Sequence, residues 1–209
     1  HHVTESQLIT VATVQFQHQA NNKQYNLLVI EKFIEQAALQ NIKILAFPEM
    51  CICGYWHVPK LTAVQVDALA ESIENSPSIA LVRALAIKYQ MLIGVGLIER
   101  ANDGRLYNAY VACMPDGSFH THRKLHAFEH PAISSGDCYT VFDTPWGVKV
   151  GILICWDNNL VENVRATTLL GADILLAPHQ TGGTHSRSPY GMKPIPLELW
   201  EQRVERKEE

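Results

Sequence analysis

Apolar segments of two different periodicities alternate along this chain, and the alternation constrains its fold more than any other feature. Residues 7–16 (QLITVATVQF) alternate in polarity and are rich in β-branched side chains, which is typical of a strand. Residues 23–40 then place apolar side chains three and four positions apart, as an amphipathic helix does, with Asn21 or Asn22 as its cap. Residues 42–47 (IKILAF) form a short buried strand that ends at Pro48.

The same alternation continues to residue 178. Helices are predicted at 61–72, at 77–90 with Pro77 near its start, and at 160–171, where Gly171 ends the helix; strands are predicted at 91–99, 106–114, 141–155 (two, joined by a turn) and 172–178. Residues 102–105 (NDGR) form a hairpin turn, and residues 120–137 form a polar, histidine-rich stretch. Because hairpins occur among strand–helix repeats, we expect a layered α/β or α+β domain with a mixed sheet, whose helices cover at least one face.

Charge and composition argue against several classes of function. The 209 residues have a net charge of −4, which provides no electrostatic surface for nucleic acid, and no basic run suits an anionic membrane. No stretch is long and apolar enough to span a bilayer. The absence of a secretory signal and an odd count of five cysteines argue against a disulfide scaffold and favour a reducing, cytoplasmic compartment.

Cys155 has the most suggestive local setting for chemistry. It is the last residue of an apolar strand (GVKVGILIC), and polar residues and then a helix follow it. A strand-to-helix turn holds a nucleophile out of the core, and the helix N-terminus lowers the pKa of a thiol there. A free cysteine is nevertheless more often a small buried apolar side chain, so the local sequence alone does not establish a nucleophile.

Two charged residues hold comparable positions. Glu49 follows a buried strand and Pro48, where an apolar interior raises the pKa of a carboxyl group, although a lone loop glutamate is commoner. Lys124 follows a strand among imidazole and apolar side chains, where an ammonium group can stabilise an oxyanion, although most lysines simply lie on the surface.

The contexts of these three residues form a recognisable set. FPEMCICGY, HRKLHAF and GILICWDNN resemble, in this order, the three characteristic segments of the nitrilase, or carbon–nitrogen hydrolase, superfamily. Each pattern is loose by itself, but the three together, from about Thr10 to Gly183, are hard to obtain by chance. The resemblance implies a four-layer α-β-β-α sandwich, with residues 3–183 as the hydrolase domain.

The resemblance also implies roles for individual residues. Glu49 would be the general base, Lys124 would stabilise the tetrahedral intermediate and Cys155 would be the nucleophile. Glu129 is the one candidate for the second glutamate that the family often carries, and a simple loop residue is an equal interpretation. Four further residues are expected to contact substrate or shape its pocket: Tyr55, Trp156, Asp157 and His179.

No metal or other cofactor is expected. The Cys51-x-Cys53 spacing lacks a second pair with zinc-finger spacing, and both cysteines are predicted to line the wall beside Glu49. His120, His122, His126 and His130 are interpreted as hydrogen-bonding histidines at the rim of a pocket.

The substrate class and the oligomeric state are predicted from the resemblance alone. Cys-Trp-Asp is more similar to the amidases and N-carbamoyl-amine hydrolases of the family than to nitrilases proper, so a small amide is the first expectation and a nitrile the second. A homodimer or larger homo-oligomer is also implied. Residues 184–209 form an irregular tail where the family usually continues with more strands and a helix, so a truncated form, a tail that contacts another subunit and a catalytically inactive binding module remain alternatives. A redox-sensing function for the cysteines is a weaker hypothesis, because no resolving cysteine is evident from the sequence.

Overall fold

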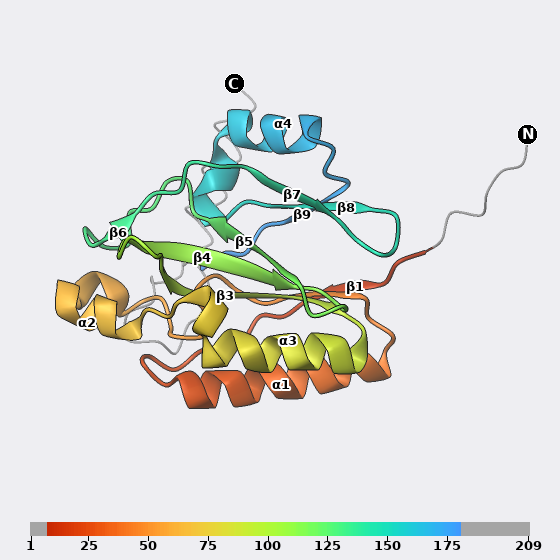
Figure 1. Cartoon of the computed structure of the whole chain (residues 1–209), viewed down its shortest axis with the longest axis horizontal. Helices are drawn as coiled ribbons and strands as arrows, with labels where there is room; N and C mark the ends of the chain where they lie inside the picture. Colours follow the sequence, from red (N-terminus) through yellow and green to blue (C-terminus); the bar gives the residue numbers. More distant parts are fainter. Residues whose placement is uncertain (1–7, 181–209) are drawn as a thin grey trace, which may run out of the picture.

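The structure is a computed structural model that describes residues 8–180, and these residues form four layers. Helices α1 (Lys23–Leu39) and α3 (Pro77–Tyr89) cover the outer face of a larger sheet, a smaller sheet packs on its inner face, and α4 (Val161–Leu169) covers the smaller sheet (Figure 1). The expected mixed α/β class and α-β-β-α order of layers are therefore confirmed. The tail at 184–209 lies outside the described residues.

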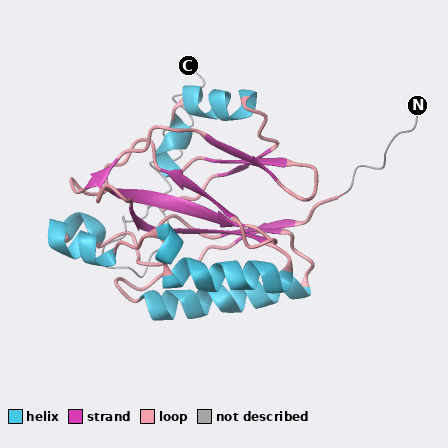
Figure 2. Cartoon of the chain, in the orientation of Figure 1, coloured by secondary structure: helices cyan, strands magenta, loops and turns pink. Residues whose placement is uncertain are grey.

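The larger sheet joins parallel and antiparallel strands (Figure 2). Its order is β1-β2-β3-β4-β5, and the short β6 also pairs with β4. The strands are β1 (Val11–Thr13), β2 (Ile44–Ala46), β3 (Leu92–Arg100), β4 (Leu106–Cys113), β5 (Phe119–Arg123) and β6 (Ile133–Ser134). Strands β1 to β3 run parallel because helices connect them, whereas tight turns make β3, β4 and β5 antiparallel, the first of them at Gly104 with φ of +84°.

The smaller sheet has three described strands, in the order β7-β8-β9. They are β7 (Thr140–Asp143), β8 (Lys149–Ile152) and β9 (Ile174–Leu176). Strands β7 and β8 form the predicted hairpin, and β9 pairs parallel to β8 after the chain crosses through α4. The carboxyl end of β8, where Cys155 follows, and that of β2, where Glu49 follows, therefore belong to different sheets.

Short elements complete the chain. They are α2 (Ala63–Leu69) and the 3-10 turns η1 (Val58–Lys60), η2 (Ile73–Asn75) and η3 (Cys155–Asn159). Asn22 caps α1 by accepting a hydrogen bond from the Tyr25 amide, and Thr62 forms a capping box at α2.

One segment differs from its predicted structure. Residues 120–137 are predicted as a polar, histidine-rich stretch with a strand only before Lys124, and β5 and β6 lie at or within it. The sequence HTHR has no apolar face to indicate a strand. Its inward residue, His122, is instead buried against polar partners, with Nδ1 2.8 Å from Oγ1 of Thr140.

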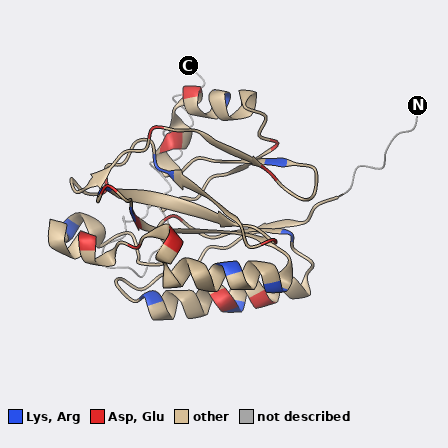
Figure 3. Ribbon diagram, viewed as in Figure 1, with Lys and Arg blue, Asp and Glu red and all other residues tan. Residues whose placement is uncertain are grey.

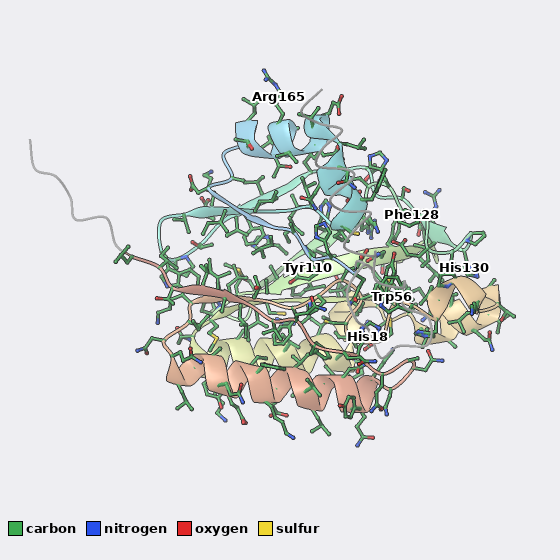
Figure 4. All side chains as sticks on the ribbon, turned by 180° about the vertical axis from the view of Figure 1, so that it is seen from behind. His18, Trp56, Tyr110, Phe128, His130 and Arg165 are labelled. Atoms are coloured by element: carbon green, nitrogen blue, oxygen red, sulfur yellow. The ribbon has the colours of Figure 1, made fainter. Side chains whose placement is uncertain are left out.

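The apolar core is divided by the larger sheet. One cluster fills the space between this sheet and helices α1 and α3, with Ile30, Ile34 and Val82 fully buried. A second cluster lies between the two sheets and contains Tyr110 and Ile152 (Figure 4), and a third contains Met50, Val58 and Ile98. Each such aliphatic side chain contributes about 1.5–3 kcal/mol by leaving water, so the sheets form a rigid frame for the residues at their ends.

The charged side chains lie mostly on the outer helices and loops, with both signs interspersed (Figure 3). Within residues 8–180, no helix is both long enough and apolar enough to cross a membrane.

Candidate active site

Glu49 reaches the interior because the chain turns sharply just after it. Strand β2 leads into Phe47 and Pro48, and the Phe47 amide still pairs with the Gly94 carbonyl. Met50 then takes a left-handed conformation with φ of +48°. This segment crosses directly over Gly96 of β3, where a Cβ atom would lie only 2.3 Å from the Met50 nitrogen. The glycine therefore allows the backbone contact that carries Glu49, which is fully buried, between the sheets.

Lys124 follows β5 and is also fully buried. Its Nζ donates a hydrogen bond to Oε2 of Glu49 at 2.7 Å and another to Oε1 of Glu129. Its ammonium group lies 4.6 Å from the centre of the Phe128 ring, which shields this side of the ion pairs from water. One lysine thus pairs with both glutamates that the sequence singled out.

Glu129 is buried in this cluster and is not an ordinary solvated loop residue. Besides Lys124, its Oε1 accepts hydrogen bonds from Nδ2 of Asn108 at 3.3 Å and from the Tyr55 hydroxyl at 3.5 Å. Its Oε2 accepts a hydrogen bond from the Phe128 amide at 3.2 Å. The structure therefore brings Glu129 together with Lys124 and Glu49 in one buried cluster.

Cys155 follows β8 at the edge of the same buried space. Its amide donates to the Pro178 carbonyl at 2.9 Å, and its φ of +48° is unusual for a residue with a side chain. Such a strained backbone persists where the surrounding structure fixes it, and it often marks functional residues. Cys155 begins the turn η3, and α4 follows at Val161, so the expected strand, polar turn and helix are present.

The electrostatics favour a resting thiol beside a carboxyl group that can take its proton. Burial raises the pKa of Glu49 to about 7, although Lys124 opposes the shift by its charge and hydrogen bond. Burial, together with the negative charge of Glu49, raises the pKa of Cys155 to about 11. The expectation that the helix N-terminus lowers this pKa was wrong, because burial and the nearby carboxylate outweigh it. Burial opposes the charge on Lys124, yet the two carboxylates raise the pKa of its ammonium group.

Asp157 does not present a free carboxylate to a substrate. It is fully buried, and its two oxygens accept hydrogen bonds of 2.9 Å from the backbone amides of Leu125 and His126. Although burial opposes its ionisation, His122 and these amides lower the pKa of Asp157. Both oxygens of Asp157 thus serve a structural contact, which ties the turn after Cys155 to the segment after Lys124.

The other three residues that were predicted to contact substrate, Tyr55, Trp156 and His179, lie in different surroundings. Tyr55 lies in the cluster through its bond to Glu129, while Trp156 is 50% exposed at the surface. His179 holds its imidazole against the Ala177 carbonyl, with Nδ1 2.6 Å from the oxygen. It lines a cavity of about 280 Å³ at the ends of β1, β2 and β9, and the lining of this cavity does not include Glu49, Lys124 or Cys155.

Two functional candidates were missed in the sequence. Asn108 of β4 donates from Nδ2 to Oε2 of Glu49 at 2.8 Å, in addition to its bond to Glu129. Gln180 donates from Nε2 to the Glu49 carbonyl at 2.9 Å, and its backbone amide donates to the Cys155 sulfur. The signal for Asn108 was a polar residue at an inward position of an otherwise apolar strand.

Cys51 and Cys53 lie close to Glu49 in the chain, and both side chains are fully buried. Burial raises the pKa of each thiol to about 12, so both are inert. The five cysteines are all free. No cluster of three or more histidine, cysteine, aspartate or glutamate side chains suited to a metal ion occurs within residues 8–180.

The sequence of this chain is similar to those of known proteins. A model of the carbon–nitrogen hydrolase family matches residues 10–206. A citrullinase from Francisella tularensis is 34% identical over 194 residues, which cover 88% of this chain and 66% of that protein. A nitrilase from Pyrococcus abyssi is 29% identical and covers 94% of this chain and 72% of its own length. An (R)-stereoselective amidase from Pseudomonas sp. is 32% identical, with coverage of 71% and 50%. The chain thus spans between half and about seven tenths of the length of these relatives.

Solved structures share the fold. Saccharomyces cerevisiae Nit3, a member of branch 10 of the nitrilase superfamily, superposes with a TM-score of 0.71 at 26% identity, covering 83% of this chain and 65% of that one. An amidase from Nesterenkonia sp. in complex with butyramide has a TM-score of 0.71 at 20% identity, with coverage of 88% and 70%. At that identity, the second likeness concerns the fold alone.

Proposed function

The chain belongs to the carbon–nitrogen hydrolase family, and from this premise we propose that it hydrolyses the C–N bond of a small amide through a thioester on Cys155. The observation that carries the proposal is the buried cluster in which Lys124 bridges Glu49 and Glu129 next to the strained cysteine. Three ionisable groups without solvent contact are costly to fold, so a catalytic use accounts for them better than a structural one.

The first half of the reaction transfers the acyl group to sulfur. Glu49 takes the proton of the Cys155 thiol as the sulfur attacks the amide carbon, so no standing thiolate is required. The resting pKa values fit this order, because Glu49, with a pKa of about 7, is partly ionised in neutral solution while Cys155, with a pKa of about 11, keeps its proton. Lys124 and the backbone amide of Trp156 would hold the oxyanion of the tetrahedral intermediate.

The second half releases the acid. Glu49 returns the proton to the nitrogen, the C–N bond breaks, and ammonia leaves a thioester on Cys155. Glu49 then takes a proton from water, whose oxygen attacks the thioester carbon, and the sulfur recovers a proton as the carboxylic acid departs. Glu129 would keep Lys124 charged and oriented through both halves, since it accepts a hydrogen bond from the same ammonium group.

An amide is favoured over a nitrile by the Cys-Trp-Asp sequence at 155–157 and by relatives named as amidases. Nitrile hydrolysis is the second candidate, because a nitrilase from Pyrococcus abyssi matches 94% of this chain. The same nucleophile serves both substrates, so the geometry of the cluster alone does not separate them.

An ammonia-release screen over small amides, carbamoyl amines and nitriles tests the proposal. We expect release from amides, loss of release in Cys155→Ala, and a fall of about 10²–10³ in turnover on removal of one oxyanion donor, as in Lys124→Met. Release from nitriles alone would overturn the amide assignment, and release that survives Cys155→Ala would overturn the thioester mechanism.

We further propose that the protein acts in a reducing, cytoplasmic compartment and assembles as a homodimer or larger homo-oligomer. Apolar side chains exposed on and beside α4 support self-association, with Val161 71%, Leu169 73% and Leu170 54% exposed. Sedimentation of the wild type and of a Val161→Asp, Leu169→Asp variant tests this: a monomeric wild type would refute it, and we expect the variant to dissociate.

A further inference from the structure

Asn108 contacts Glu49, Lys124 and Glu129 of the buried cluster through two different parts of the residue. Its backbone carbonyl accepts a hydrogen bond of 2.8 Å from the Lys124 amide, which continues the β4–β5 pairing by one residue. Its side-chain amide lies between the two glutamates, with Nδ2 2.8 Å from Oε2 of Glu49 and 3.3 Å from Oε1 of Glu129. The residue is fully buried, so none of these contacts is shared with bulk water.

The two carboxylate oxygens that contact Asn108 are the same two that accept hydrogen bonds from Lys124. Two buried carboxylates of like charge repel each other, and one ammonium group balances only one of them. A neutral amide group has two hydrogens on a single nitrogen, so it can bind both carboxylates without adding a charge. Asn108 therefore completes the bridge that Lys124 begins.

The orientation of the amide supports a directed role. With Nδ2 toward the carboxylates, Oδ1 of Asn108 is buried and has no hydrogen-bond partner among the described residues. If the amide were reversed, Oδ1 would face two carboxylate oxygens, and the repulsion among these acceptors would cost more than one unpaired carbonyl oxygen. The fold thus keeps an unpaired buried carbonyl in order to direct both amide hydrogens at Glu49 and Glu129.

We propose that Asn108 is a positioning residue of the hydrolase, which fixes the separation and orientation of the Glu49 and Glu129 carboxylates around Lys124. This inference rests on the function proposed above, because it assigns Asn108 a part in preparing the general base. The bond from Asn108 favours the ionised form of Glu49, which is the form that accepts the thiol proton.

The pH dependence distinguishes this role from a merely structural one. The hydrogen bond from Asn108 lowers the pKa of Glu49 against the larger effect of burial, so its loss raises that pKa above the present value of about 7. One charged hydrogen bond corresponds to a change of about one pH unit. The acid limb of the rate profile should therefore move toward higher pH by this amount, with about a tenfold loss of turnover at pH 6.5 and substantial recovery at pH 9.

The experiment compares Asn108→Leu with Asn26→Leu over pH 5.5–9.5. Asn26 is a suitable control because it is also fully buried, and its Nδ2 also donates two hydrogen bonds, but to the carbonyls of Gln19 and Ile52. We expect the control to lose stability without moving the acid limb. Should Asn108→Leu fail to fold, Asn108→Ser removes the same bridge with a smaller side chain.

A second measurement keeps this inference separable from the proposed function. In protein labelled with ¹³C at the glutamate carboxyl carbons, the Glu49 signal is identified by its loss in Glu49→Gln, and its titration is followed by NMR in each Asn108 variant. A higher midpoint in the variants supports the inference even if the wild type hydrolyses no amide, which would refute only the proposed function. An unchanged midpoint overturns the inference, and so does an activity loss that is equal at every pH.

Discussion

Replacing Glu49 by glutamine should stabilise the protein increasingly as the pH rises, although it removes the proposed general base. The folded state gives Glu49 a pKa of about 7 because of its burial, whereas an unfolded chain gives it the ordinary value of 4.5. Between these two values the folded state holds a proton that the unfolded state has released. Each pH unit in this interval therefore reduces the free energy of unfolding by about 1.4 kcal/mol.

The size of the effect follows from the separation of the two pKa values. From 4.5 to about 7, the cost of an ionised Glu49 accumulates to about 3 kcal/mol and then stays constant at higher pH. Glutamine does not titrate, so the Glu49→Gln variant lacks this cost. The difference in unfolding free energy between variant and wild type should increase by about 3 kcal/mol between pH 4.5 and 8, whatever its value at pH 4.5.

Urea denaturation at both pH values, followed by tryptophan fluorescence, measures this difference. Glu71→Gln is the matched control, because the pKa of Glu71 is lowered: burial would raise it, but Lys23, Ser76 and Ser78 outweigh burial through their hydrogen bonds. The stability that Glu71 contributes is present above its ordinary pKa and is lost as the pH falls through its folded value. Between pH 4.5 and 8 the control should therefore be destabilised by a nearly constant amount, and this penalty should shrink only at pH values below 4.5.

Between pH 4.5 and 8, the stability difference from the wild type should therefore change with pH for Glu49→Gln and stay nearly constant for Glu71→Gln. A difference between Glu49→Gln and the wild type that is constant with pH would refute the reasoning, and so would one that decreases as the pH rises. A confirmed slope would mean that the fold gives up stability in order to hold a carboxyl group with a pKa suited to proton transfer at neutral pH.

Three further predictions concern the frame around the site. Asp157→Asn should destabilise the protein by about 2 kcal/mol in urea unfolding, because one of the two backbone amides loses its acceptor and the other keeps only a neutral one; a variant as stable as the wild type would contradict this. Gly96→Ala should cost about 3 kcal/mol or prevent folding, since its Cβ would lie 2.3 Å from the Met50 nitrogen, and a normal melting temperature would rule out this close approach. Iodoacetamide at pH 8 should modify Cys155 faster than the fully buried Cys113, as mass mapping will show; equal rates would contradict the greater accessibility of the Cys155 thiol.

The sequence by itself was sufficient for the order of the elements. Apolar periodicity predicted α1, α3 and the β3–β4 hairpin, because these segments bury one continuous face and local spacing reports that burial directly. It did not reveal β5, since His122 is buried by polar partners that lie 18 and 35 positions away in the chain. A pattern that reports only apolar burial is insensitive to a strand stabilised by hydrogen bonds.

The sequence also indicated which residues to examine for chemistry. Glu49, Lys124 and Cys155 were selected by their positions after strands and by resemblance to a family, and Glu129 only as one of two equal alternatives. The contacts in the structure favour the interpretation of Glu129 as part of the site, because its carboxylate is buried against Lys124.

Only the tertiary structure decided how these groups interact. The pKa of Cys155 is raised where the local sequence predicted that it is lowered, and Asp157 binds backbone amides where a substrate contact was expected. Asn108 was not recognised at all. Burial and Coulomb energies depend on the distances among side chains that lie 59 or 75 positions apart in the chain, as Asn108 and Lys124 do from Glu49. Those distances are set by the packing of two sheets against each other, and no local pattern contains them.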